Sequence, residues 1–427
     1  MRNPWLWVPT LYLAEGFPNA LATTVALILY QDLGISNGRV TFYTGLFYLP
    51  WVIKPLWSPV VDILRTRRLW IWQTQLLLGL ALTGIAMSLS ATHFFVISMA
   101  FFWLLTFCSA THDIAADGFY MLGLAEKEQS FFVGVRGTFF RIALLCAQGP
   151  FIIYVGRLEA RTGNVALSWA LAFASMAAVF LCMGIYHAVV LPRPAADSPG
   201  DTESLRKFFT EFFSTFEAFF KKPKIGAMLL FLLFYRFGEA QLLKVTPLFV
   251  KHARVDGGLG LTTEQFGTIY SMVGVVALLA GGIAGGILVS RHGLRAWLWP
   301  MVIVMHLPDA VFIYLSYARP ENLHLTAACV ALEQFGYGFG FTAYMLYMIY
   351  IARGPHSTAH YAICTGFMAL GLMVPGLWSG KLQEILGYPH FFIWAMLATI
   401  PGFIVTALIP LDAEFGKRSA GDSPAGR

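Results

Sequence analysis

Long apolar stretches, each about as long as a membrane is thick, alternate with short polar breaks along nearly the whole chain. A helix needs about 20 predominantly apolar residues to cross the roughly 30 Å hydrocarbon core of a bilayer. On this basis the pattern predicts twelve spans, near residues 5–30, 41–62, 69–90, 94–118, 131–156, 167–191, 224–250, 263–290, 296–317, 323–352, 360–380 and 389–410. The fold class that this pattern indicates is an all-α polytopic membrane protein.

The longest polar break divides the spans into six and six. We therefore expect an N-terminal six-helix half, a linker, a C-terminal six-helix half and a tail, at residues 1–191, 192–223, 224–411 and 412–427. Two related halves are typical of secondary transporters. Within the linker, phenylalanines recur at helical spacing opposite charged residues, which predicts an amphipathic helix on the cytoplasmic membrane face. Two roles stay open for this helix: a structural strap that joins the halves, and a regulatory or lipid-sensing element.

Composition narrows the class of protein. The chain is 57% hydrophobic and only 12% charged, which no soluble domain of this size tolerates. Its five cysteines all lie in apolar segments without metal-ligand spacing, so we expect neither a metal site nor a redox centre. No nucleotide-binding, zinc-protease or nucleophile-elbow motif is present, so we expect a cofactor-free protein that is not an enzyme and that uses a solute gradient.

Lysine and arginine residues fix the expected orientation. With a cytoplasmic N-terminus, seventeen of them lie in inside segments and seven in outside loops. This positive-inside bias, together with an even number of spans, predicts that both termini are cytoplasmic. Topology then accounts for the net charge of +6, so a nucleic-acid partner has no support.

A short basic turn follows the second span. It comprises Asp62, at a helix end, and then Arg65, Arg67 and Arg68. This segment resembles the loop motif of the major facilitator superfamily, in which the acid and the arginines latch neighbouring helices on the cytoplasmic side. The resemblance implies a conformational latch at these four residues. A basic loop that serves only the positive-inside topology remains the alternative.

Charged side chains also occur inside the predicted spans, where their burial in the bilayer is energetically unfavourable and where such residues are usually functional. Asp113 and Asp117 are four residues apart and share a helix face, so their carboxylates repel unless one is protonated or both are paired with cations. The cations expected in the same half are Lys54, Arg136 and Arg141. A structural ion-pair network and a site for an anion or a transferred proton are both open. A sodium site using Asp113, Ser109 and Thr111 is a further alternative.

Four segments carry a closer resemblance. They are the Leu-Trp-Ser-Pro-Val-Val-Asp run after Lys54, the His-Asp-Ile-Ala-Ala-Asp-Gly segment from His112, and residues 235–240 and 333–343. Together they resemble the muropeptide permease branch of the major facilitator superfamily, and the second is also similar to the acetyl-CoA transporter branch. Members of the permease branch import N-acetylglucosaminyl-1,6-anhydro-N-acetylmuramyl peptides released by cell-wall turnover.

The resemblance implies which residues line the cavity, because spans one, four, seven and ten do so in this superfamily. The expected substrate contacts are Glu15, Asn19, Lys54, His112, Arg141, Arg236, Glu239, Gln241, Tyr337 and Tyr344. The expected proton-coupling residues are Asp113, Asp117, Glu239 and Glu333.

The expected function is therefore proton-coupled import of an anionic amino-sugar or anhydro-muropeptide by alternating access. The expected partners are this small-molecule saccharide, the proton and membrane lipid, and we expect a monomer in the bacterial inner membrane. Two alternatives stay open: transport of another cargo, such as a different disaccharide, acetyl-CoA or a drug-like compound, and a membrane receptor that transports nothing.

Overall fold

Helices account for almost all of the computed structural model, which describes residues 3–58, 61, 64–124, 126–195, 197–198, 214–354 and 357–417. These residues include no β-strand. Contacts divide the chain into two compact units. Unit 1 comprises Met1–Phe212 and Thr262–Thr268, and unit 2 comprises Phe213–Leu261 and Ile269–Arg427. The domain boundaries expected from the sequence stay a prediction.

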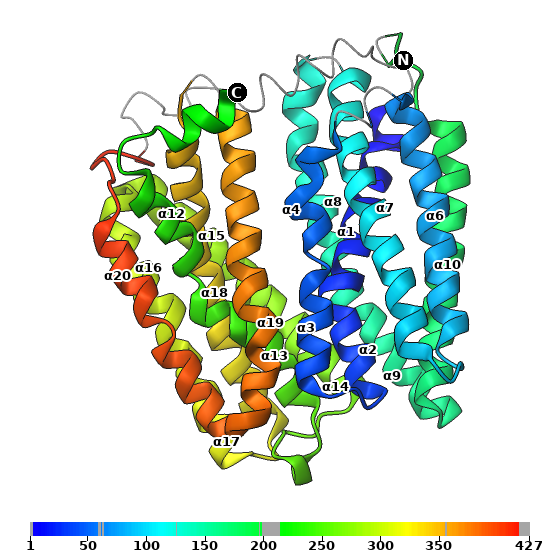
Figure 1. Cartoon of the computed structure of the whole chain (residues 1–427), viewed down its shortest axis with the longest axis vertical. Helices are drawn as coiled ribbons and strands as arrows, with labels where there is room; N and C mark the ends of the chain where they lie inside the picture. Colours follow the sequence, from blue (N-terminus) through cyan, green and yellow to red (C-terminus); the bar gives the residue numbers. More distant parts are fainter. Residues whose placement is uncertain are drawn as a thin grey trace. The chain divides into compact units, whose positions relative to one another are not determined.

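Unit 1 is a helical bundle, drawn from blue to green in Figure 1. Its elements are η1 (Pro4–Leu6), α1 (Val8–Ala20), the π-helical η2 (Leu21–Val25), α2 (Ala26–Asp32), α3 (Asn37–Leu46), α4 (Leu49–Ile53), η3 (Lys54–Leu56), α6 (Arg67–Ser88), α7 (Phe94–Gly123), α8 (Glu126–Gln148), α9 (Pro150–Thr162), α10 (Val165–Val190) and α14 (Thr263–Phe266). Several of these helices begin at a capping side chain: Thr66 accepts from Leu69 N at the start of α6, and Asn164 accepts from Leu167 N at the start of α10.

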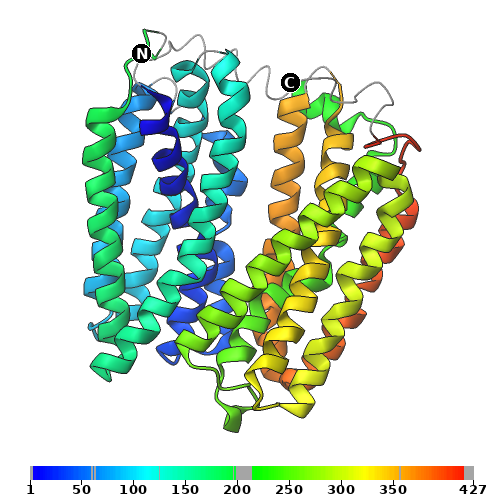
Figure 2. The same cartoon turned by 180° about the vertical axis from the view of Figure 1, so that it is seen from behind.

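Unit 2 is a second bundle, drawn from light green to red and shown from behind in Figure 2. Its elements are α12 (Ile225–Phe234), α13 (Phe237–Lys251), η4 (Arg254–Asp256), most of the π-helical η5 (Gly267–Val273), α15 (Gly274–His292), α16 (Leu294–His306), η6 (Leu307–Asp309), α17 (Ala310–Ala318), α18 (Leu323–Ala352), α19 (Ser357–Leu397) and α20 (Ile400–Leu408). An aromatic cluster that includes Phe231, Tyr235, Tyr344 and Tyr347 forms much of its core.

Helix is present in each of the twelve predicted spans, and the all-α polytopic fold is confirmed. Among the described residues, nine helices are long and apolar enough to cross a membrane. One of them, His360–Leu408, covers the last two predicted spans, which are separate helices that meet at Gly387, where φ is 71° and ψ is 163°. The second predicted span is instead built from the short helices α3, α4 and η3.

Three spans are interrupted near residues that carry charge. The first contains Pro18 and continues as the π-helical turn η2. The seventh breaks between α12 and α13, where Arg236 has φ −111° and ψ 22°. The ninth breaks at the 3-10 turn η6, which contains Pro308 and ends at Asp309. Interrupted spans of this kind commonly build the binding sites of transporters.

Glycines allow the helices of each unit to pack closely. In unit 1, a Cβ atom at Gly79 would lie 2.7 Å from the Leu181 side chain, and one at Gly184 would lie 2.7 Å from Leu76. In unit 2, a Cβ atom at Gly338 would lie 1.9 Å from the carbonyl oxygen of Leu278. The outer surface of these helices carries exposed apolar side chains such as Met87 and Ile185, as expected of a surface that faces hydrocarbon.

The linker is described only in part. Most of the predicted amphipathic helix falls on residues 199–213, which lie outside the described residues. The following residues, 214–220, are helical, and the Phe219 ring is fully buried in the core of unit 2. Lys222 then donates to the carbonyl oxygens of Ile351, at 2.5 Å, and Arg353, at 2.9 Å, where α18 ends. Burial lowers the pKa of this lysine from its usual value.

Candidate functional site

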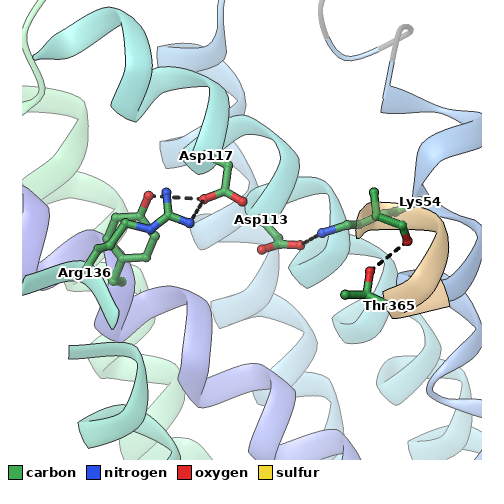
Figure 3. Close-up of polar contacts among 7 residues, drawn as sticks. Lys54, Asp113, Asp117, Arg136 and Thr365 are labelled. Atoms are coloured by element: carbon green, nitrogen blue, oxygen red, sulfur yellow. Dashed lines mark hydrogen bonds and ion pairs between the residues drawn. The ribbon is translucent and has the colours of Figure 1, made fainter. Parts of the chain in front are cut away.

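A cluster of acidic and basic side chains lies inside unit 1 (Figure 3). Lys54, in η3, forms an ion pair and hydrogen bond with Asp113 Oδ2 on α7. One turn further along α7, Asp117 Oδ1 is 3.0 Å from an Nη2 atom of Arg136 on α8. The two aspartates that share a helix face therefore each have a cation of their own, which offsets their mutual repulsion.

Aromatic side chains position the Arg136–Asp117 pair. Tyr12, on α1, donates a hydrogen bond of 3.2 Å to Asp117 Oδ1. The Arg136 guanidinium lies 4.9 Å from the centre of the Tyr12 ring and 5.1 Å from that of Tyr120. Arginine stacks well on aromatic faces, and the rings exclude water around the charge.

Glu15 adds a third carboxyl group to this cluster. Its side chain is only 8% exposed, and it lies close enough to Asp113 and Asp117 to interact electrostatically with both. Like charges repel strongly away from water, so a proton on one of the three carboxyl groups relieves this repulsion. Three carboxyl groups, two cations and one proton make the cluster electrically neutral.

His112 lies in a different polar chain. It is fully buried, and its Nε2 atom is 2.9 Å from Gln75 Nε2 on α6. Gln75 Oε1 is 2.7 Å from His187 Nδ1 on α10, and His187 Nε2 is 2.9 Å from Thr10 Oγ1 on α1. This chain joins four helices, so the contacts of His112 are those of a side chain that holds the bundle together.

The other expected substrate contacts in unit 1 are more open. Asn19 is half-buried on α1, four residues after Glu15. Arg141 is exposed on α8, five residues after Arg136, and it has no hydrogen bond or ion pair with any residue that the structure describes. Arg141 therefore differs from Lys54 and Arg136, whose charges already have protein partners.

The predicted latch is described in part. Asp62 lies outside the described residues, and Arg65 is exposed. Arg68 donates to the carbonyl oxygens of Ala188 and Leu191, at the end of α10. The backbone N–H groups of Arg67 and Arg68 donate to the carboxylate of Asp197 at 2.8 and 3.0 Å. The basic turn thus connects the start of α6 to the end of α10, while its role as a conformational latch stays a prediction.

Arg236 is the central cation of unit 2. Its side chain is 4% exposed, and it donates a hydrogen bond to the hydroxyl group of Tyr337 on α18. Its guanidinium carbon lies 4.5 Å from the centre of the Phe341 ring and 5.8 Å from that of Tyr344. The break between α12 and α13 places this charge inside an aromatic cage.

The remaining predicted residues of unit 2 separate into two groups. Gln241 accepts a hydrogen bond of 2.9 Å from Trp394 Nε1, and Tyr344 donates one of 2.7 Å to the carbonyl oxygen of Leu232. Both side chains thus hold neighbouring helices together. Glu239 and Glu333 are instead buried carboxyl groups, 0% and 2% exposed, and they lie close to Asp309.

Sequence reasoning missed several of these contributions. Tyr12 and Tyr120 surround Arg136, but aromatic residues are too frequent in this chain to single out two of them. Asp309 was not among the expected site residues, although an acid directly after Pro308 in an apolar segment is a recognisable signal of a functional helix break.

Comparison with known proteins places the chain in a family. The model of the Major Facilitator Superfamily matches residues 10–371. The chain belongs to this superfamily. It is accordingly a multi-pass membrane transporter and not an enzyme.

The similarity to individual relatives extends over nearly the whole chain. "Putative transporter AmpG 4" of Rickettsia conorii is 25% identical over 407 residues, which cover 92% of this chain and 93% of the relative. "Anhydromuropeptide permease" of Escherichia coli K12 is 24% identical over 409 residues, covering 94% and 79%. The expected resemblance to the muropeptide permease branch is therefore confirmed.

Solved structures show the same fold. The nucleoside transporter NupG superposes with a TM-score of 0.69 at 15% identity, covering 96% of this chain and all of that one. A D-xylose-proton symporter superposes with a TM-score of 0.66 at 13% identity, covering 97% and 99%. At such identities these likenesses support the fold and leave the cargo of this chain open.

Proposed function

We propose that this protein is a proton-coupled importer of anionic amino-sugar or anhydro-muropeptide fragments, working by alternating access in a bacterial inner membrane. The observation that carries the coupling is that three carboxyl groups inside unit 1, those of Glu15, Asp113 and Asp117, lie beside the two cations Lys54 and Arg136. A bound proton would cancel the one negative charge that the two cations leave. Glu15, Asp113 and Asp117 are thus the candidate proton-coupling groups of unit 1.

Charge balance explains how the proton can be coupled to movement. With the proton bound, the charges of the cluster cancel. Without it, three carboxylates face two cations, and one negative charge is left in a low-dielectric interior. An uncompensated buried charge is strongly unfavourable, so a change of conformation that buries the cluster further is favoured only with the proton in place.

Arg141 is the leading candidate for cargo recognition. Lys54 and Arg136 already pair with aspartates, and the Arg236 charge is enclosed by aromatic rings. Arg141 is exposed without a described partner, so its guanidinium is available to bind a carboxylate through two parallel hydrogen bonds. The relative named as an anhydromuropeptide permease supports a cargo of this type.

Transport by purified protein in proteoliposomes tests the proposal. We expect labelled anhydro-muropeptide to accumulate when a proton gradient is imposed, and the accumulation to collapse when a protonophore is added. Accumulation of labelled acetyl-CoA or of an unrelated disaccharide under the same gradient, without accumulation of anhydro-muropeptide, would replace the proposed cargo.

Glu15→Gln tests the coupling group separately. The amide keeps the size of the side chain but cannot release a proton, so uphill accumulation should be lost while exchange of cargo across the membrane continues. Glu264→Gln is the matched control, because Glu264 pairs with Arg157 at 3.1 Å and both side chains are about half exposed or more. Uphill accumulation by Glu15→Gln at the wild-type level would remove this residue from the coupling mechanism.

A further inference from the structure

Three carboxyl groups converge inside unit 2, and each comes from a different span. Glu239 lies in the first turn of α13, Asp309 ends the turn η6 before α17, and Glu333 lies within α18. One oxygen atom of each lies within 4.8 Å of the other two, and the side chains are 0%, 1% and 2% exposed. Two of the three therefore lie at helix breaks, close to helix N-termini, where the helix dipole favours negative charge.

The oxygens of this carboxyl cluster (Glu239, Asp309 and Glu333) are nearly all without partners. Neither oxygen of Glu239 and neither oxygen of Asp309 has a hydrogen-bond partner among the described residues. Glu333 accepts hydrogen bonds from Gln334 Nε2 on the same helix, at 3.0 and 3.3 Å. Burying polar oxygens without hydrogen bonds is unfavourable, and it indicates that something else satisfies them.

A buried histidine also points into the cluster without a bond. The Nδ1 atom of His306 is 3.8 Å from Asp309 Oδ2, too far for a hydrogen bond, and has no other partner among the described residues. Its Nε2 atom is already occupied by the carbonyl oxygen of Tyr235, at 3.1 Å. The side chain is 1% exposed, so bulk water does not satisfy Nδ1.

Nearby positive charge does not neutralise the cluster. Arg236 lies close enough to interact electrostatically with Glu239, but it forms no ion pair with it, and its hydrogen bond goes to Tyr337. One arginine charge thus faces three carboxylates. The two remaining negative charges call for protons, a bound cation or both.

The spacing of the oxygens suits a bound cation. Both oxygens of Glu239 and both of Asp309 are without a hydrogen-bond partner among the described residues, and one oxygen of each of the three residues lies within 4.8 Å of the other two. Oxygens bound to one ion at about 2.3 to 2.6 Å can be as far apart as about 5 Å, which is compatible with the spacing of this cluster.

We propose that Glu239, Asp309 and Glu333 form a binding site for a sodium ion, with one of the three carboxyl groups protonated, so that Arg236, the ion and the proton together balance the charge. An all-oxygen ligand set selects hard cations over transition metals. Among hard cations, Mg²⁺ dehydrates reluctantly and demands strict octahedral geometry, and a divalent ion is harder to desolvate than a monovalent ion of similar size. Sodium therefore suits a site inside a transport domain that must also release its ion. The proposal goes beyond the proposed function and does not depend on the cargo.

Sodium binding to the purified full-length protein in nanodiscs, without cargo, tests the proposal. We expect saturable binding of radioactive sodium and a rise in melting temperature with sodium chloride that potassium or choline chloride does not reproduce. Glu239→Gln and Asp309→Asn should each weaken sodium binding at least about tenfold, since even supporting residues of a metal site contribute this much. Glu384→Gln, whose side chain pairs with Lys381 at 3.2 Å, should bind like the wild type.

The melting temperature without sodium shows whether each variant is folded. Asp309→Asn removes a buried charge, so in potassium buffer it should melt at or above the wild-type temperature while losing the gain from sodium. The proposal is overturned if wild-type protein shows no saturable sodium binding, if the two variants bind sodium as the wild type does, or if Ca²⁺ or Mg²⁺ stabilises the protein and sodium does not. None of these outcomes bears on proton-driven uptake, which is measured with cargo.

Discussion

At the scale of single residues, the partner of each buried charge decides what that charge can do. Arg136 is bonded to Asp117 and lies against two tyrosine rings, so its charge is occupied by the protein. Arg141, five residues further along α8, has no described partner and is exposed. Arg141 can therefore bind a carboxylate of the cargo, whereas Arg136 already binds Asp117. Mutation of Arg141 tests this difference.

Arg141→Lys should weaken binding of a carboxylate-bearing cargo about tenfold, because lysine offers only a point charge and cannot form the two parallel hydrogen bonds of a guanidinium group. A neutral analogue, the same sugar without its acid, should bind as before. Calorimetry on purified protein measures both affinities. Arg157→Lys, at an arginine that pairs with Glu264, is the matched control. Equal losses for both ligands would show that Arg141 is structural.

The Lys54–Asp113 pair gives a second test. Asp113→Asn leaves the Lys54 charge beside a neutral amide, so the melting temperature should fall. The double variant Lys54→Gln/Asp113→Asn removes both charges, and it should recover much of the lost stability, because replacing both members of a partly buried pair is less harmful than removing one. Thermal unfolding of the wild type, both single variants and the double variant measures the interaction energy between Lys54 and Asp113. Additive losses would mean that the two groups do not stabilise each other.

The sequence predicts part of this cluster and not the rest. The four-residue spacing of Asp113 and Asp117 places them on one helix face, and their need for cations follows from electrostatics. The closeness of Glu15 to Asp113 could not be predicted, because it depends on how α1 packs against α7. The same holds for the chain of His112, Gln75 and His187, whose members come from three helices.

At the scale of elements, interruptions of the helices place the polar side chains. Pro308 makes the break before Asp309 foreseeable, since proline cannot continue the hydrogen-bond ladder. The break at Arg236 has no proline, and tertiary contacts support it: Tyr344 donates to the carbonyl oxygen of Leu232, and His306 bonds to that of Tyr235. The carbonyl groups that such a break frees are hydrogen-bonded by side chains of other helices, and a sequence pattern does not reveal these contacts.

The glycines of α18 offer a test at this scale. Gly338→Ala would place a Cβ atom 1.9 Å from the Leu278 carbonyl oxygen, so α15 and α18 must separate, and we expect a loss of about 1–3 kcal/mol in stability. Gly286→Ala, on α15, meets no atom within 4 Å and should be neutral or stabilising by up to about 1 kcal/mol. Thermal unfolding in one detergent compares the two variants. Equal effects would argue against close packing as the role of Gly338.

At the scale of the whole molecule, hydropathy predicts the number of spans, and the charge of the loops predicts their orientation. The helices bear out the spans, because about 20 apolar residues in water-free surroundings must bond their own backbone. Orientation depends on the distribution of Lys and Arg across the membrane, which a helix bundle alone does not reveal. It remains a prediction for experiment.

We expect both termini and residues 192–223 to be cytoplasmic. In a functional variant without the five native cysteines, a cysteine introduced at Ser198 should be protected from an impermeant thiol reagent added to intact cells, and one at Asp256 should react. Both residues are exposed, so burial does not explain a difference between them. Permeabilised cells provide the control, because both cysteines should react there. Reaction at Ser198 with protection at Asp256 would mean that the chain is inserted in the opposite orientation, and equal reaction at both in intact cells would contradict an odd number of spans between them.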